Sequence, residues 1–389
     1  MGETGKKIKD GRKLRGLTQR ELSAASGVSL SVIRKLEQGD REGARMETLR
    51  ALAGALRFST MDLVGAPSEE GPIGDTHETW KAVRDELNSP PVRYDSDDER
   101  PSKDGVSLVL ADVVPLYREH KFTELARALP LLLRDADALG ADGRRVRVRV
   151  LQVAAGALTH TRQFKTAEEV AKRILDDAAD RMESAATVNT LCWLLMRQGR
   201  LDEALSWATQ WADELEPRFT RASEGEFAAW GLLLLNVSAA AARNNQPGVA
   251  ADALKFARSA ATAIGHEVQP AHENMRTFGP TSVRMRVVED ALVRDQPDVA
   301  LRLAERIPRY RVQPSASVRA RHGLDVAKAY TQLGRYGQAF EKLAKVQAFS
   351  PEWFPNQSPA RDVLRSVVAG RRTLTPEMRA MADALRLHL

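Results

Sequence analysis

The sequence predicts an all-α protein with two helical domains of different kinds, and three observations favour this class. Beyond residue 105 apolar residues recur with helical periodicity, alanine is abundant and no segment alternates convincingly as a strand would. A pattern of small residues then returns every 37 to 50 residues, which indicates stacked helix pairs. Residues 18–38 contain two short helices around a glycine turn. We expect a compact N-terminal helical domain followed by an α-solenoid.

The two short helices are defined by local capping signals. Thr18 and Glu21 form a capping box, which starts the first helix. Gly27 ends it, because glycine adopts the positive φ of a sharp turn. Ser29 is placed to cap a second helix that runs to about Gln38. The order of cap, helix, turn and helix predicts two helices that meet at a steep angle.

The second helix has one apolar face and one outward face. Ile33 and Leu36 would seat it on the first helix. Lysine can donate to guanine edges, serine to either kind of base edge, and leucine can contact a thymine methyl group. The outward positions hold these side chains: Leu30, Ser31, Arg34 and Lys35. They are candidate readers of double-stranded DNA, although a plain solvated helix face has the same composition.

The flanking motifs resemble the xenobiotic-response-element, lambda-repressor-like family of bacterial DNA-binding domains over residues 6–65. The motifs that carry the resemblance are RGLTQ at 15–19, EQG at 37–39, METL at 46–49 and STMDL at 59–63. The resemblance implies a five-helix domain in which Arg12 pairs with Glu37. It also implies that Gln19 touches a phosphate and that Arg45 approaches the DNA backbone or minor groove. Gly11 departs from the family pattern and should cost about 1 kcal/mol of helix stability.

Charge divides the chain into three parts. Residues 1–65 carry thirteen basic and eight acidic side chains, so most of the net charge of +6 lies on the candidate DNA domain. Residues 66–104 are acidic and contain prolines, which predicts a linker, with a possible short helix at 77–88. The acidic run at 95–99 is either solvated or a competitor of DNA for the basic face. Residues 105–389 form the third part.

Residues 105–389 resemble tetratricopeptide repeats. Each short turn is followed by an aromatic residue, leucine or proline: Phe122, Phe164, Leu201, Pro247, Pro297 and Tyr336. Three positions later stands a small or aliphatic residue that lets two helices approach: Leu125, Ala167, Ala204, Ala250, Ala300 and Ala339. We expect six helix pairs and a final one after residue 359, stacked as a right-handed superhelix with a concave binding surface.

Polar residues on the first helices of the pairs are candidates for that surface. The expected ligand contacts are Asn189, Trp193, Asn236 and Arg284, with His160 and His322 also on these helices. Asn189 and Asn236 could equally bridge neighbouring repeats. The long insertion at 265–280 offers Arg276 as an anion-binding guanidinium and Phe278 as an aromatic wall, or it serves as a lid or strut.

Several function classes are disfavoured. We find no phosphate-binding glycine loop, zinc motif or catalytic constellation, so we expect no enzyme, cofactor or metal. The single cysteine, Cys192, is expected in the core and fits a reducing cytoplasm. No signal peptide is evident, and the longest apolar run, at 227–242, is too short to span a membrane.

The combination of the two domains resembles bacterial one-component regulators of actinobacterial type. Peptide-pheromone receptors share this layout. These resemblances imply a cytoplasmic homodimer that binds a paired DNA site and responds to a small-molecule or peptide effector in the repeats. The alternative is a regulator or adaptor whose repeats bind another protein. The residues alone leave both hypotheses open.

Overall fold

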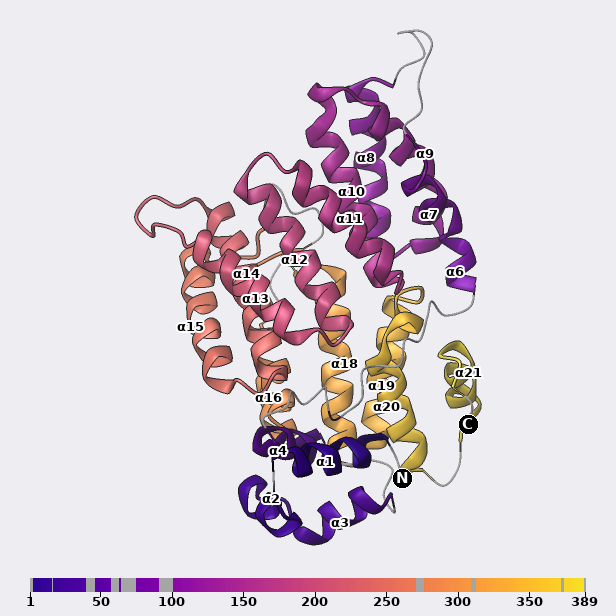
Figure 1. Ribbon diagram of the computed structural model, residues 1–389. Coiled ribbons are helices and arrows are strands. Elements are labelled where there is room, and N and C mark those ends of the chain that lie inside the picture. The colour runs from indigo at the N-terminus through magenta and orange to yellow at the C-terminus, as the bar shows by residue number, and fades with distance from the viewer. Residues whose placement is uncertain are drawn as a thin grey trace.

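The computed structural model describes residues 3–15, 17–39, 46–56, 63, 75–90, 101–270, 276–308, 313–371 and 374–387. Every regular element among these residues is a helix, and the one β-type contact is an isolated antiparallel bridge between Val268 and Phe278. The all-α prediction is therefore confirmed. Figure 1 shows a small N-terminal group of helices at one end of a larger array of paired helices.

Four described helices build the N-terminal domain: α1 (Glu3–Leu14), α2 (Gln19–Ser26), α3 (Leu30–Gln38) and α4 (Met46–Leu56). The predicted capping box is present, since Thr18 accepts from the amide of Glu21 and the Glu21 carboxylate accepts from the Thr18 amide. Gly27 ends α2 with a φ of 70°, and Ser29 caps α3. The fifth helix expected at 59–63 lies outside the described residues except for Leu63, which is helical and buried.

Gly5, near the start of α1, lies very close to the backbone of α3. A Cβ on Gly5 would lie 2.0 Å from the carbonyl oxygen of Leu36, so only glycine lets α1 approach α3 this closely. Arg15 donates from Nε to the Leu56 carbonyl at 3.0 Å, which ties the end of α1 to the end of α4. The buried apolar side chains come from all four helices: Ile8, Leu22, Ile33, Leu36, Leu52 and Leu56.

The short helix expected within the linker is present and packs on the second domain. It divides at Trp80 into α6 (Asp75–Thr79) and α7 (Lys81–Leu87). Trp80 and Val83 are fully buried and join the core of the helix pairs, because α7 packs on α9. Within the segment expected as a linker, this helix therefore takes part in the packing of the array. Residues 64–74 and 91–100 lie outside the described part of the chain.

Consecutive helices form antiparallel pairs, as expected for a helical repeat array. The six pairs are α8 (Lys103–Arg118) with α9 (Phe122–Ala138), α10 (Arg144–His160) with α11 (Phe164–Asp177), α12 (Arg181–Arg197) with α13 (Leu201–Glu214), α14 (Glu224–Arg243) with α15 (Pro247–Ile264), α16 (Pro280–Val293) with α17 (Pro297–Glu305), and α18 (Ala316–Gln332) with α19 (Tyr336–Phe349). The shorter α20 (Ser358–Ala369) and α21 (Pro376–Ala384) follow. Each second helix begins at the residue that the sequence predicted.

One turn geometry recurs in all six pairs. The second residue before each second helix has a left-handed backbone: His120, Arg162, Gly199, Asn245, Asp295 and Gly334, with φ between 57° and 77°. The amide of the next residue then bonds to the carbonyl five residues back, as Arg335 does to Tyr330 at 2.8 Å. This hydrogen bond belongs to the Schellman motif, which ends a helix by satisfying its last carbonyls. The repeat in sequence is therefore also a repeat in backbone conformation.

Small residues set the distance between the paired helices. The residues at these positions are all fully buried, as the sequence predicted: Leu125, Ala167, Ala204, Ala250, Ala300 and Ala339.

Of the described helices, α14 is long and apolar enough to cross a membrane by length and composition. However, 89 % of its most apolar window is buried inside the protein, where it packs against α13 and α15. This distribution is that of a core helix.

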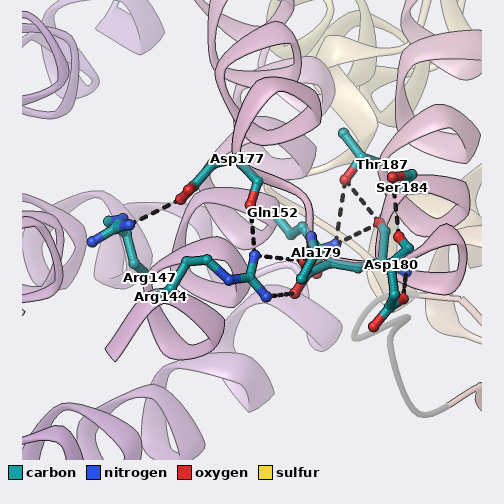
Figure 2. A network of polar contacts seen from close by, with 9 residues as sticks. Arg144, Arg147, Gln152, Asp177, Ala179, Asp180, Ser184 and Thr187 are labelled. Atoms are coloured by element: carbon teal, nitrogen blue, oxygen red, sulfur yellow. Dashed lines mark hydrogen bonds and ion pairs between the residues drawn. The ribbon is translucent and has the colours of Figure 1, made fainter. Parts of the chain in front are cut away.

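Figure 2 shows how polar side chains lock α10 against the start of α12. Arg144 donates to the Asp177 carbonyl at 2.6 Å and to the buried carboxylate of Glu183 at 2.7 Å. That carboxylate also accepts from the Ala179 amide at 3.0 Å. Asp180 caps α12 through the Glu183 amide at 2.9 Å. The network satisfies a helix terminus and a buried charge together, so we assign it to structure.

Hydrogen bonds close the array by joining its first two pairs to the segment after α19, a link that the expectation of a right-handed superhelix did not include. His120 in the first pair lies 2.9 Å (Nδ1 to Oγ) from Ser350, which follows α19. Thr123 donates its amide to the Glu352 carboxylate at 2.7 Å, and Trp353 donates from Nε1 to Nδ1 of His160 at 3.1 Å. These contacts join parts of the chain that lie between 193 and 230 residues apart in sequence.

Candidate nucleic-acid interface and interior polar site

The outward face of α3 has the side chains that the sequence proposed as DNA readers. Ser31, Arg34 and Lys35 are exposed, and Leu30 is half-buried at the start of the helix. Ile33 and Leu36 on the opposite face are buried in the domain core. Ser29 is exposed and accepts from the Val32 amide at 3.4 Å as the helix cap. The structure thus places these side chains on one solvent-exposed surface.

A buried carboxylate holds α3 in place. Arg12 donates to Glu37 from Nε at 2.7 Å and from NH2 at 2.8 Å, which confirms the pairing implied by the family resemblance. Gln19 donates to the same carboxylate at 2.8 Å. Burial alone would raise the pKa of Glu37, but the hydrogen bonds from Arg12 and Gln19 outweigh it and the pKa is lowered. Glu37 therefore stays ionised and joins α1, α2 and α3.

The other two side chains expected to contact DNA are Gln19 and Arg45. The Gln19 amide nitrogen is engaged by Glu37, so this side chain is oriented within the domain beside the start of α2. Whether its remaining surface meets a phosphate stays a prediction. Arg45 belongs to residues 40–45, which lie outside the described residues.

Several of the expected ligand residues meet in the interior of the array. Asn236 on α14 donates to the side chain of Asn189 on α12 at 2.8 Å, and both are buried. Arg276 donates to the Asn189 carbonyl at 3.0 Å, and its guanidinium lies 5.4 Å from the ring centre of Trp193. The two asparagines thus bridge neighbouring pairs, which was the structural alternative. Asn189, Trp193, Asn236 and Arg276 form one connected group.

Phe278 and Arg284, the other two expected ligand contacts, do not belong to this connected group. Phe278 is fully buried and packs against α14, where a Cβ on Gly231 would lie 2.1 Å from its ring. The expectation of Phe278 as a wall beside Arg276 is corrected, because the aromatic ring next to that guanidinium belongs to Trp193. Arg284 is exposed on α16. A glycine opposite a buried aromatic ring indicates packing, so Phe278 anchors the insertion to the core.

His160 is a buried structural histidine. Its ring centre lies 4.5 Å from that of Trp193 and 5.4 Å from that of His120. Burial, with the nearby charges of His120, Arg197 and Arg276, lowers the pKa of His160 well below its usual value. The ring is therefore neutral and accepts the hydrogen bond from Trp353. This contact joins residues 193 positions apart, and no sequence pattern indicated it.

A second buried group surrounds Glu289 on α16. Its carboxylate binds Arg243, Arg286 and Arg321, which come from α14, α16 and α18. Burial raises the pKa of Glu289, but the three guanidinium groups overcome this effect and hold it low. Arg321 also pairs with Asp325 at 3.2 Å, and burial raises the pKa of Asp325 to about 6. Three helix pairs are thereby joined through one carboxylate, a link that the sequence analysis missed.

Among the described residues no group of three or more histidine, cysteine, aspartate or glutamate side chains is arranged to hold a metal ion. Cys192 is buried, and burial raises the pKa of its thiol to about 12.

The comparison with protein families supports the N-terminal assignment. The helix-turn-helix family model matches residues 8–63. No curated protein matches the chain. The match covers α2 and α3, the described core of the N-terminal domain and the residues that hold α3 in place. Residues 8–63 are thus similar to helix-turn-helix domains.

Proposed function

We propose that this chain is a sequence-specific DNA-binding transcriptional regulator. The observation that carries the proposal is the exposed face of α3, which presents Ser31, Arg34 and Lys35 on a helix fixed by the Arg12–Glu37 pair. A helix held in this way can enter a major groove without losing its orientation. The family match to residues 8–63 supports the same function.

The proposed roles follow from the chemistry of each side chain. Lys35 donates to guanine O6 or N7, Ser31 donates to or accepts from base edges, and Leu30 contacts a thymine methyl group. Arg34 and Ser29 contact the phosphate backbone, with Gln19 and Arg45 as further backbone contacts. Backbone contacts supply salt-dependent affinity, and the base contacts supply discrimination.

We also propose that the chain acts as a cytoplasmic homodimer. One recognition helix reads only half of a typical operator, and symmetric dimers read two half-sites about one helical turn apart. We propose residues 1–65 as the DNA-binding unit and residues 105–389 as a tetratricopeptide-like unit for sensing and dimerisation. The packing of α7 on α9 supports extending the second unit to residue 75.

We further propose that an effector bound in the repeat array controls the affinity for DNA. The connected group of Asn189, Trp193, Asn236 and Arg276 offers amide, aromatic and cationic contacts in one place. One of its residues, Asn236, lies on α14, and the turn after α14 meets the N-terminal domain, where Gly54 on α4 faces the Asn245 side chain. An effector alters operator affinity only if it prefers one of two arrangements of the domains.

A second candidate function is control by a partner protein instead of a small effector. Two leucines favour it, because Leu108 on α8 is 70 % exposed and Leu131 on α9 is 61 % exposed. Contiguous exposed apolar patches mark protein contacts, and these two leucines belong to the two helices of one pair. Residues 105–389 would then act as the docking module of the regulator or of an adaptor.

Sequencing of genomic fragments captured by the purified full-length protein tests the proposed function. We expect a small set of fragments that share a paired motif. Recovery of fragments without any shared motif, at a salt concentration where the protein remains folded, would contradict sequence-specific reading. Repeating the capture with cell-extract fractions of low and high molecular mass then separates a small effector from a protein partner.

A further inference from the structure

Arg197, at the end of α12, lies between two aromatic rings inside the closed array. Its guanidinium carbon is 5.5 Å from the centre of the Phe164 ring and 5.6 Å from that of Trp193. It donates from NH2 to the Asn356 carbonyl at 2.8 Å. These contacts fix the plane of the guanidinium and give it favourable contacts with two π faces.

The same guanidinium lacks an acidic partner among the described residues. Its NH1 atom is shielded from solvent and has no hydrogen-bond partner. Burial, with the nearby charges of Arg162 and Arg321, lowers the pKa of Arg197 to about 9, so the group is still a cation at neutral pH. A buried cation without a counter-ion is costly, and buried polar groups in proteins normally have partners.

Several other partly buried arginines of this array are paired with carboxylates. Arg200, three residues further on, binds Glu168 and Glu203, each at 2.6 Å. Arg144 binds Glu183 at 2.7 Å, and Arg321 is shared between Glu289 and Asp325. Arg197 has no such carboxylate among the described residues, and its hydrogen bond from NH2 goes to a backbone carbonyl.

A second guanidinium approaches the same indole. Arg276 lies 5.4 Å from the centre of the Trp193 ring and donates from NH1 to the Asn189 carbonyl at 3.0 Å. Arg197, Trp193 and Arg276 each keep part of their surface exposed, while the NH1 atom of Arg197 itself is shielded from solvent. His160, which packs on Trp193, is neutral and adds no competing charge.

We propose that Arg197 and Arg276, which both contact Trp193, bind the anionic group of a small molecule, either a carboxylate or a phosphate. The planar donor edge of a guanidinium matches both groups. An anion bound beside NH1 would give this atom the hydrogen-bond partner that it lacks. The ligand would be the effector of the proposed regulator. This role rests on the proposed function, whereas the binding of the anion does not.

Thermal unfolding of the full-length protein with inorganic phosphate, with succinate and with chloride at matched ionic strength tests the site without DNA. An anion that binds only the folded state raises the unfolding temperature as its concentration rises. We expect phosphate or succinate, or both, to stabilise the protein beyond chloride. A response to phosphate alone identifies phosphate as the ligand group, and a response to succinate alone identifies a carboxylate.

Two matched variants give opposite patterns. Arg197→Met should weaken the apparent affinity for the anion at least about tenfold, because a charge-assisted hydrogen bond is lost. Its unfolding temperature without anion should be unchanged or raised, since an uncompensated charge is removed. Arg200→Met should lower the unfolding temperature and leave the anion affinity within about twofold.

Arg276→Met serves as the second probe of the site, and it should weaken anion binding as well. The proposal is overturned if neither phosphate nor succinate stabilises the wild type more than chloride does. It is also overturned if both Arg197→Met and Arg276→Met keep wild-type affinity. These outcomes do not depend on DNA, so operator binding by the same preparation separates a failure of this site from a failure of the proposed function.

Discussion

Lys35 shows how one side chain is left available for an external partner. It is exposed on α3, one position before the buried Leu36 and two before the buried Glu37. Because its neighbours hold the helix, the ammonium group is free to be used for recognition without a cost in packing. Arg34 shares the same exposed surface.

Replacing Lys35 by alanine tests base reading. Lys35→Ala should weaken binding to the captured site by about 1 to 3 kcal/mol and relax the preference at one base pair. Fluorescence anisotropy with operator variants measures both effects. Lys255→Ala is the control, because Lys255 is an exposed lysine on α15 that pairs with Asp252. An equal loss on all sequences would make Lys35 a phosphate contact, and unchanged affinity on every DNA would refute its role.

The left-handed turn residues are a second feature at this scale. Gly334 has a φ of 70° and open space around the position of a Cβ. Gly334→Ala should lower the free energy of unfolding by about 1 to 2 kcal/mol, because backbone strain is its only cost. Gly334→Asn should cost less, since asparagine tolerates this conformation.

Urea unfolding measures both variants. Gly248→Ala is the matched control, because Gly248 also has open space but lies in the first turn of α15 without a positive φ. We expect it to be neutral or slightly stabilising. An equal loss for Gly248→Ala and Gly334→Ala would refute the role of the turn.

At the scale of helices, the sequence predicted what local signals determine. Thr18, Gly27 and the six residues that begin the second helices were found because caps and turns depend on neighbouring residues. The contact between His160 and Trp353 joins distant parts of the chain, so no local pattern reports it. The family resemblance supplied the Arg12–Glu37 pair, which spacing alone did not indicate. The exposed face of α3 was predictable, and the interior around Arg197 was not.

The contact between α10 and α12 gives a prediction at the same scale. Glu183 is buried and accepts hydrogen bonds from Arg144 and from the Ala179 amide (Figure 2). Glu183→Gln should lower the free energy of unfolding by about 3 kcal/mol, because Arg144 loses its counter-ion in a partly buried place. Chemical denaturation provides the measurement.

Glu203→Gln is the control for this network. Glu203 also pairs with an arginine, but its side chain is 53 % exposed, so the loss should stay below about 1 kcal/mol. Equal losses in the two variants would show that burial does not determine the strength of these pairs.

At the scale of the whole molecule, His120 connects the first and last pairs. It is buried between Ser350 and Ser317, at 2.9 and 2.8 Å. Burial, with the nearby charge of Arg319, lowers the pKa of His120 from 6.5 to about 4. The neutral ring is therefore the form that closes the array.

The pH dependence follows from this shift. A histidine whose folded pKa is below its unfolded pKa stabilises the fold above the unfolded value, and this stability is lost as pH falls towards the folded value. We expect the free energy of unfolding to decrease between about pH 6.5 and pH 4, with about 3 kcal/mol from His120. Urea unfolding across this range measures it.

His120→Asn should reduce this slope while keeping a residue that tolerates the φ of 61° at this position. His266→Asn is the control, because the His266 side chain is 55 % exposed and should leave the slope unchanged. A slope that His120→Asn does not alter would assign the acid sensitivity to other groups.

The closure of the array also limits how such a protein can change in length. An open solenoid can gain or lose a repeat by duplication or deletion, because each repeat needs only its neighbours. Here Ser350 must meet His120, Glu352 must meet Thr123 and Trp353 must meet His160. Insertion or removal of one helix pair would separate all three contacts at once. The number of pairs is therefore fixed by geometry, as the number of subunits is in a closed ring.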